Sequence, residues 1–172
     1  RRRYVDLSDT DRSRIRDRPS NVAFTVTVSR GEGADATQAS LAGQLHRNWS
    51  VSTGTDHWTI DLEAGVVLHE AALWSVATAI DADPGLRLVY TDYDHLDAGD
   101  RHTDPAFLPD WNPELFTGLG HISALVAFHP ALDSGIAADL EPAAVTHLPH
   151  LLASVPGPQL TQDPADVARA AP

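Results

Sequence analysis

Strand-like and helix-like segments alternate along this chain, and the alternation limits the folds that it can adopt. Val22–Val28 is rich in β-branched residues and alternates in polarity, as a strand does. Trp58–Leu62 and Leu86–Thr91 have a similar composition, while Leu68–Ile80 between them repeats apolar residues at helical spacing. Asp83-Pro84-Gly85 ends that helix, because proline cannot continue it. The pattern predicts an α/β domain with a mostly parallel central sheet flanked by helices.

Weaker signals predict the remaining elements. A helix is expected over Ala36–Leu45, with Asp35 or Thr37 as its N-cap. Short strands are expected at Trp49–Val51 and His121–Phe128, and a short strand or a turn of helix at Val145–Leu152. The domain organisation that follows is a basic polar linker or arm at residues 1–20, a folded domain at 21–155 and a Pro/Ala-rich tail at 156–172.

Charge is distributed unevenly along the 172 residues. Seven of the twelve arginines lie in the first 18 residues, so the rest of the chain carries five arginines against twenty acids. An acidic body of this kind argues against binding nucleic acid through its phosphates. The basic N-terminal arm has three readings: contact with anionic lipid, contact with RNA, or, most simply, a solvated linker or frayed helix that follows an upstream domain.

Cellular location is limited by what the sequence lacks. No run of 18 apolar residues is present to span a membrane, and no apolar segment follows the N-terminal arginines as in a signal peptide. The absence of cysteine excludes disulfides and thiolate metal sites. We therefore expect a cytoplasmic protein that associates with membranes only through a partner or another domain of a longer polypeptide.

The segment Leu88–Leu132 is dense in chemically informative residues. Acidic side chains follow a buried strand, and a Pro-Asp-Trp-Asn-Pro turn comes after them. In order and spacing the segment resembles the bacterial inverting glycosyltransferases of family two, which have a GT-A type fold and build cell-surface polysaccharides. The resemblance extends more weakly over residues 22–152. Its strongest matches are Tyr90, Asp92, Asp94, Asp97, Asp104-Pro105, Phe107, Pro109-Asp110-Trp111, Pro113-Glu114-Leu115, His121 and Leu132.

This resemblance implies a shortened GT-A-like domain that uses a nucleotide-sugar donor, a glycan acceptor and Mg²⁺ or Mn²⁺. The cation would neutralise the diphosphate leaving group on an Asp-x-Asp motif. At the matching position the chain has Glu63-Ala64-Gly65-Val66, with only one acid retained. Asp61 and Glu63 would share one face of a strand, so they are the candidate metal ligands. The alternative is a strand end with a solvent-facing acid.

The resemblance also implies roles for six further residues. Asp92, Asp94, Asp110, Trp111 and His121 are candidates for the donor or sugar site, and Asp139 is the candidate catalytic base. Two of them have a simpler alternative: Trp111 could seal a loop against the core, and Asp139 could be an N-cap or a loop acid. Asp97-Ala98-Gly99-Asp100 is more simply a turn.

The chain departs from the family where the family binds its nucleotide. Only Val51–His57 stands where a much longer nucleotide-binding segment is expected. Two functions follow from the resemblance: a polysaccharide glycosyltransferase, or a non-catalytic glycan-binding or assembly module within a larger protein. The degraded metal motif favours the second for this chain alone. A third possibility is an unrelated α/β domain.

Overall fold

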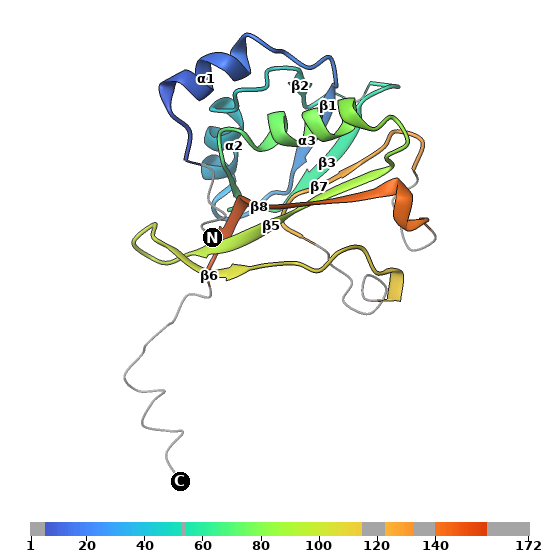
Figure 1. The fold of residues 1–172 in the computed structure, drawn as a ribbon. Coiled ribbons are helices and arrows are strands. Elements are labelled where there is room, and N and C mark those ends of the chain that lie inside the picture. The colour runs from blue at the N-terminus through green and yellow to red at the C-terminus, as the bar shows by residue number, and fades with distance from the viewer. Residues whose placement is uncertain (1–5, 53, 115–122, 133–139, 158–172) are drawn as a thin grey trace.

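The computed structural model describes residues 6–52, 54–114, 123–132 and 140–157. Its centre is an eight-stranded sheet in the order β2-β1-β3-β7-β5-β8-β4, with β6 paired to β5 beside this path. Three helices lie above the sheet in Figure 1, whereas β6 and the segment that follows it lie below. The helices are α1 (Asp9–Arg16), α2 (Ala34–Ala42) and α3 (Ala72–Ala82). The strands are β1 (Phe24–Val28), β2 (Trp49–Ser50), β3 (Trp58–Leu62), β4 (Val67–Leu68), β5 (Leu88–Leu96), β6 (His102–Ala106), β7 (Val126–Phe128) and β8 (Val145–Pro156).

The sheet is mixed. Strand β1 pairs in parallel with β2 and β3, and β5 pairs in parallel with β8. Strand β7 joins these two groups by running antiparallel to both β3 and β5, and β4 and β6 add antiparallel pairs to β8 and β5. The α/β class predicted from the sequence is confirmed, and β7 supplies antiparallel pairing that the sequence pattern did not indicate.

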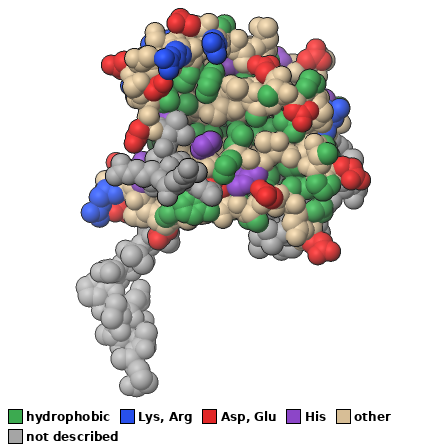
Figure 2. Space-filling view, in the orientation of Figure 1, with side chains coloured by type: hydrophobic (Ala, Val, Ile, Leu, Met, Phe, Trp, Pro, Cys, Tyr) green, Lys and Arg blue, Asp and Glu red, His purple; other side chains and the backbone are tan. Residues whose placement is uncertain are grey.

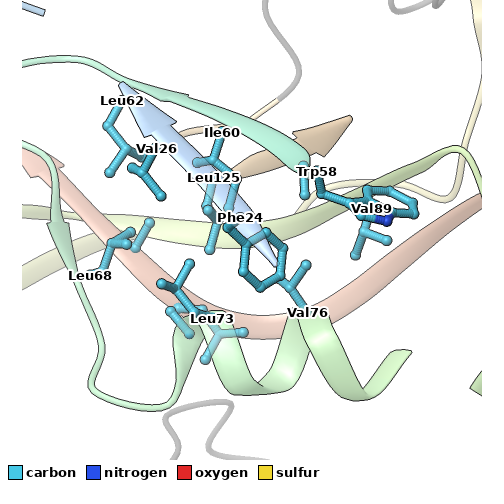
Figure 3. Packing of buried hydrophobic residues seen from close by; sticks show 14 of the residues in the cluster. Phe24, Val26, Trp58, Ile60, Leu62, Leu68, Leu73, Val76, Val89 and Leu125 are labelled. Carbon is cyan, nitrogen blue, oxygen red and sulfur yellow. The ribbon is translucent and has the colours of Figure 1, made fainter. Parts of the chain in front are cut away.

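The main core lies between the sheet and α3. Figure 3 shows side chains of β1 and β3 pointing toward Leu73 and Val76 of α3, with Leu125 in the middle of the cluster and Leu68 and Val89 at its two sides. Phe24, Val26 and Ile60 are completely buried, as the alternation in the sequence predicts for one face of a strand. This burial of apolar side chains is the main force that holds helices and sheet together.

Several predicted boundaries differ from the structure: α2 ends at Ala42, and β7 begins only at Val126 among the described residues. The starts of α2 and α3 show a physical reason. Helix α2 has Gly33 as its N-cap, with no side-chain cap, so neither Asp35 nor Thr37 serves there. The Thr37 hydroxyl instead accepts a hydrogen bond from Gly65 N at 2.9 Å. Leu68, predicted as the first helical residue, lies in β4 because it pairs with Ala153 of β8, and α3 begins only at Ala72. Long-range contacts override the local signal at both places.

Strand β8 is much longer than the predicted short strand. It extends over twelve residues and pairs with β5 from Leu88↔Val145 to Leu96↔Pro156, with register shifts around Asp92. Strand β5 likewise continues beyond Thr91 to Leu96. This long parallel pair brings residues 145–156 beside the acidic part of β5.

Helix α1 packs on the outside of the helical layer. It begins with a capping box in which Ser8 and Asp11 satisfy each other's backbone N–H groups. Ile15 is buried in a small cluster with Leu45 and Ala71, and the Arg12 guanidinium donates to Glu70 at 2.8 Å. Among the described residues, no helix is long and apolar enough to cross a membrane.

Gly65 provides a test of how closely β4 and β8 approach. Its φ is +93°, and a Cβ there would lie 2.6 Å from Pro156 Cγ. We expect Gly65→Ala to lower the free energy of unfolding by about 2 kcal/mol, through backbone strain and overpacking. Urea denaturation measures the change. Gly43→Ala is the matched control, because Gly43 has a φ of −79° and its added Cβ would meet no atom closer than 3.5 Å. Equal losses in the two variants would contradict this account.

Candidate functional site

One face of β5 carries the acidic residues that the sequence singles out. Tyr90, Asp92 and Asp94 alternate with residues that face the main core, so they point to the opposite side of the strand. That side is covered by β6 and by residues 107–111, here called the covering loop. The Asp92 and Asp94 side chains are only 0% and 1% exposed. Two carboxylates buried this deeply require hydrogen-bond donors close by.

Asp92 is bound by a histidine from β8. The Nε2 atom of His147 lies 2.8 Å from Asp92 Oδ1, and the backbone N–H of Leu108 donates to the same oxygen at 2.8 Å. The other ring nitrogen, Nδ1, is 3.7 Å from the carboxylate of Asp110, which is fully exposed. His147 therefore lies between a buried acid on the strand and an exposed acid on the covering loop.

Aromatic contacts also hold the covering loop against β5 and β8. The Tyr90 ring stacks on His147 with centroids 4.7 Å apart, and its hydroxyl donates to the Pro109 carbonyl at 2.6 Å. Trp111 packs near Tyr90, and its indole Nε1 donates to the Leu140 carbonyl at 3.3 Å. Trp111 thus seals the loop against the small cluster around Leu88, Tyr90 and Val145. Stacking of Trp111 on a sugar stays a prediction.

Asp94 forms a second pair with a histidine. His102 Nδ1 lies 2.8 Å from Asp94 Oδ2, and Ser154 Oγ approaches the same nitrogen at 3.4 Å. A serine nucleophile and its orienting acid would have to contact different ring nitrogens. These three residues are therefore not arranged as a hydrolytic triad.

The interpretation of Asp97–Asp100 as a turn is confirmed. The Arg101 side chain donates to Asp97 Oδ2 at 2.9 Å, and the backbone N–H groups of Gly99 and Arg101 donate to Oδ1. The Arg101 hydrogen bonds, followed by that from Gly99, lower the pKa of Asp97. The acid is engaged in shaping the connection between β5 and β6.

The two candidate metal ligands lie elsewhere on the sheet. Asp61 and Glu63 are exposed and the residue between them, Leu62, is buried, so the two acids share a side as the alternation predicts. Asp61 accepts a hydrogen bond from the Thr27 hydroxyl. Strand β7 stands between β3 and β5, which separates this pair from Asp92 and Asp94.

No group of three or more metal-binding side chains forms within the described ranges. Mg²⁺ commonly uses only one or two carboxylates and takes its other ligands from phosphates and water. Asp61 and Glu63, the exposed acids at the end of β3, could supply these one or two carboxylates. The metal site therefore stays a prediction. The candidate base Asp139 and the candidate sugar ligand His121 lie outside the described residues.

Sequence reasoning missed the role of His147, whereas His102 lies only eight residues after Asp94 and could be expected near the acids. His147 is 55 residues away from Asp92 along the chain, and no local motif links the two. The only available signal was the resemblance of Val145–Leu152 to a late strand of the glycosyltransferase family, which places His147 in register without showing its partner.

Comparison with known proteins gives partial matches. The chain is 41% identical over 66 residues to the uncharacterized protein y4gI of Sinorhizobium fredii, which covers 38% of this chain and 7% of that protein. It is 43% identical over 61 residues to the O-antigen biosynthesis protein RfbC of Myxococcus xanthus, which covers 36% of this chain and 5% of that protein. No family model matches the chain. The matched part thus spans less than a tenth of each of these relatives, and one of the two belongs to polysaccharide biosynthesis.

Removing His147 tests the buried pair. We expect His147→Ala to lower the free energy of unfolding by about 3 kcal/mol, because Asp92 would stay buried without its histidine. Chemical denaturation measures the loss, and His150→Ala is the control because His150 is exposed on the same strand. A loss in His147→Ala no larger than in His150→Ala would contradict a structural role for the pair.

Tyr90 gives the site a measurable response to alkaline pH. Burial, assisted by the charges of Asp110 and Asp92, raises the pKa of Tyr90 to about 12. Because the folded state favours the neutral phenol, the associated stability is fully present below the unfolded pKa of about 10. It is lost as the pH rises through about 12. In an ultraviolet titration of tyrosinate, one of the three tyrosines should ionise late.

Two variants assign that late ionisation. Tyr90→Phe should abolish it, and Tyr93→Phe should leave it in place. A late step that survives in Tyr90→Phe would show that the buried phenol is not its source.

Proposed function

We propose that this chain is a GT-A-like domain of a protein that synthesises cell-surface polysaccharide, and that it binds or positions the glycan rather than transferring a sugar. The observation that carries the proposal is the use of Asp92 and Asp94. Both carboxylates are buried and bonded to His147 and His102. Because these carboxylates are buried and hydrogen-bonded, they hold the covering loop and leave little carboxylate surface for a nucleotide sugar.

The covering loop has the side chains that a glycan site needs. Phe107 is 53% exposed and Asp110 is fully exposed, while Pro109 and Trp111 between and beside them are fixed to the body of the domain. An exposed aromatic ring can pack on the apolar face of a sugar, and a carboxylate accepts hydrogen bonds from its hydroxyls. A loop already fixed in place loses little entropy on binding.

The partial match to an O-antigen biosynthesis protein supports the polysaccharide context. The matched relatives are far longer than this chain, which fits a module that works beside neighbouring domains of a larger polypeptide. We place that protein in the cytoplasm or at the cytoplasmic face of a membrane, reached through a partner or another domain.

The exposed pair at the end of β3 favours a second candidate, an active glycosyltransferase. Asp61 and Glu63 would hold Mg²⁺ or Mn²⁺, which when bound would neutralise the diphosphate of the leaving nucleotide. Asp139 would then accept the proton of the attacking glycan hydroxyl. The retained acid pair supports this reading, and the short segment between β2 and β3 opposes it.

Calorimetric titration separates the two candidates. We expect the purified chain to bind fragments of a surface polysaccharide and to give no heat with UDP, GDP or dTDP, with or without Mn²⁺. Phe107→Ala should weaken glycan binding about tenfold, since stacking and burial of one ring contribute about 1–2 kcal/mol. Val51→Ala is the control, because Val51 is exposed on another part of the surface.

The other outcomes are equally informative. Manganese-dependent nucleotide binding that disappears in Glu63→Gln, but not in the exposed control Asp83→Asn, would replace the binding module with the enzyme. A well-folded chain that binds neither glycan nor nucleotide would overturn both candidates.

A further inference from the structure

A cavity of about 390 Å³ is lined by none of the residues of the predicted donor site. It lies between the end of α1, the link from α2 to β2 and the first turn of α3. Residues 45–48 precede β2 and residues 19–20 precede β1, so the cavity lies at the amino ends of these parallel strands. Ligands of open α/β sheets normally bind at the carboxyl ends. The cavity is therefore separate from the site proposed above, and its size suits a small molecule.

The inner wall of the cavity is apolar. Ile15 and Leu45 are buried and belong to one hydrophobic cluster with Ala71. Trp74, on the first turn of α3, packs against that cluster and keeps part of its ring exposed. An apolar group entering the cavity would be removed from water on these surfaces, which favours binding.

The rim of the cavity is cationic. Arg16 and Arg47 line it, and both are exposed. Ion pairs among the described residues engage Arg12 with Asp9 and Glu70, and Arg14 with Asp11. None of these described pairs involves Arg16 or Arg47, and Arg16 acts on Glu70 only at longer range: the pKa of Glu70 is lowered first by the Arg12 hydrogen bond and only weakly by the charge of Arg16. Figure 2 shows a group of blue side chains over α1, on a chain whose net charge is −12.

The hydrogen bond that Arg47 makes within the protein leaves its guanidinium group able to bind an anion. One of its nitrogens, Nη1, donates to the Ala42 carbonyl at 2.8 Å, which orients the group and leaves its other N–H donors for a ligand. His46, also in the lining, is buried and hydrogen-bonded to the Val22 carbonyl. The cationic character of the rim therefore comes from the two arginines.

We propose that this cavity binds a small organic anion. The acidic group of the ligand, a phosphate, sulfonate or carboxylate, would lie between Arg16 and Arg47, whose planar guanidinium groups match such oxygens. Its ring or short aliphatic portion would pack on Ile15, Leu45 and Trp74. The inference does not depend on whether the domain transfers sugar.

Fluorescence titration with two probes of similar shape tests the proposal. 8-Anilinonaphthalene-1-sulfonate carries the anion and two ring systems, whereas N-phenyl-1-naphthylamine is its neutral counterpart. We expect the sulfonate to bind more tightly, and the double variant Arg16→Gln/Arg47→Gln to weaken it about tenfold or more. The neutral probe should change by less than about twofold, since it makes no charge-assisted hydrogen bond.

Arg30→Gln is the matched control, because Arg30 is exposed and lies outside the cavity. If Arg30→Gln lowered the affinity for the sulfonate as much as the double variant did, the effect would come from net charge alone, and the proposed site would be overturned. Equal affinity for the two probes would overturn it as well. Sedimentation with phosphatidylglycerol vesicles that requires both arginines would identify the anion as a lipid headgroup. Probe binding without sedimentation would identify it as a soluble molecule.

Discussion

The buried carboxylate of Asp92 is the constraint on which the site depends. A carboxylate without solvent contact is unfavourable unless donors reach it, and here the donors come from His147 on β8 and from the backbone of Leu108. Both donors must be present together, so the pairing of β5 with β8 and the path of the covering loop are coupled. The stacked ring of Tyr90 and its bond to Pro109 reinforce the same arrangement.

The acidic residues singled out in the sequence thus lie in two different settings on the sheet. On the β5–β8 side, acids, histidines and aromatic rings are used to fix a loop that presents Phe107 and Asp110 to solvent. At the end of β3, Asp61 and Glu63 are exposed to solvent, whereas Asp92 and Asp94 are buried. Under the proposed function, the first arrangement would hold a glycan, and the short segment before β3 would account for a smaller nucleotide-binding surface.

Local signals predicted the elements whose pattern is strong. The strands at residues 24–28 and 58–62 and the helix over most of 72–82 follow from alternation and helical spacing. Strand β4 and the full length of β8 were not predictable, because each depends on a partner far away in the chain. The Thr37 hydroxyl accepts a hydrogen bond from Gly65 N, and Leu68 of β4 pairs with Ala153 of β8. The same holds for the site residues: the acids of β5 and the nearby His102 stood out in the sequence, but the distant partner His147 did not.

The sequence by itself determined the α/β class and the acidic residues of β5, because both can be read from residues close together in the chain. Only the tertiary structure decided that Asp92 and Asp94 are buried against His147 and His102. It alone placed α1 so that Arg16 borders a cavity with an apolar inner wall. The physical reason is that burial and charge pairing are properties of contacts between distant segments, and spacing along the chain does not encode which segments meet.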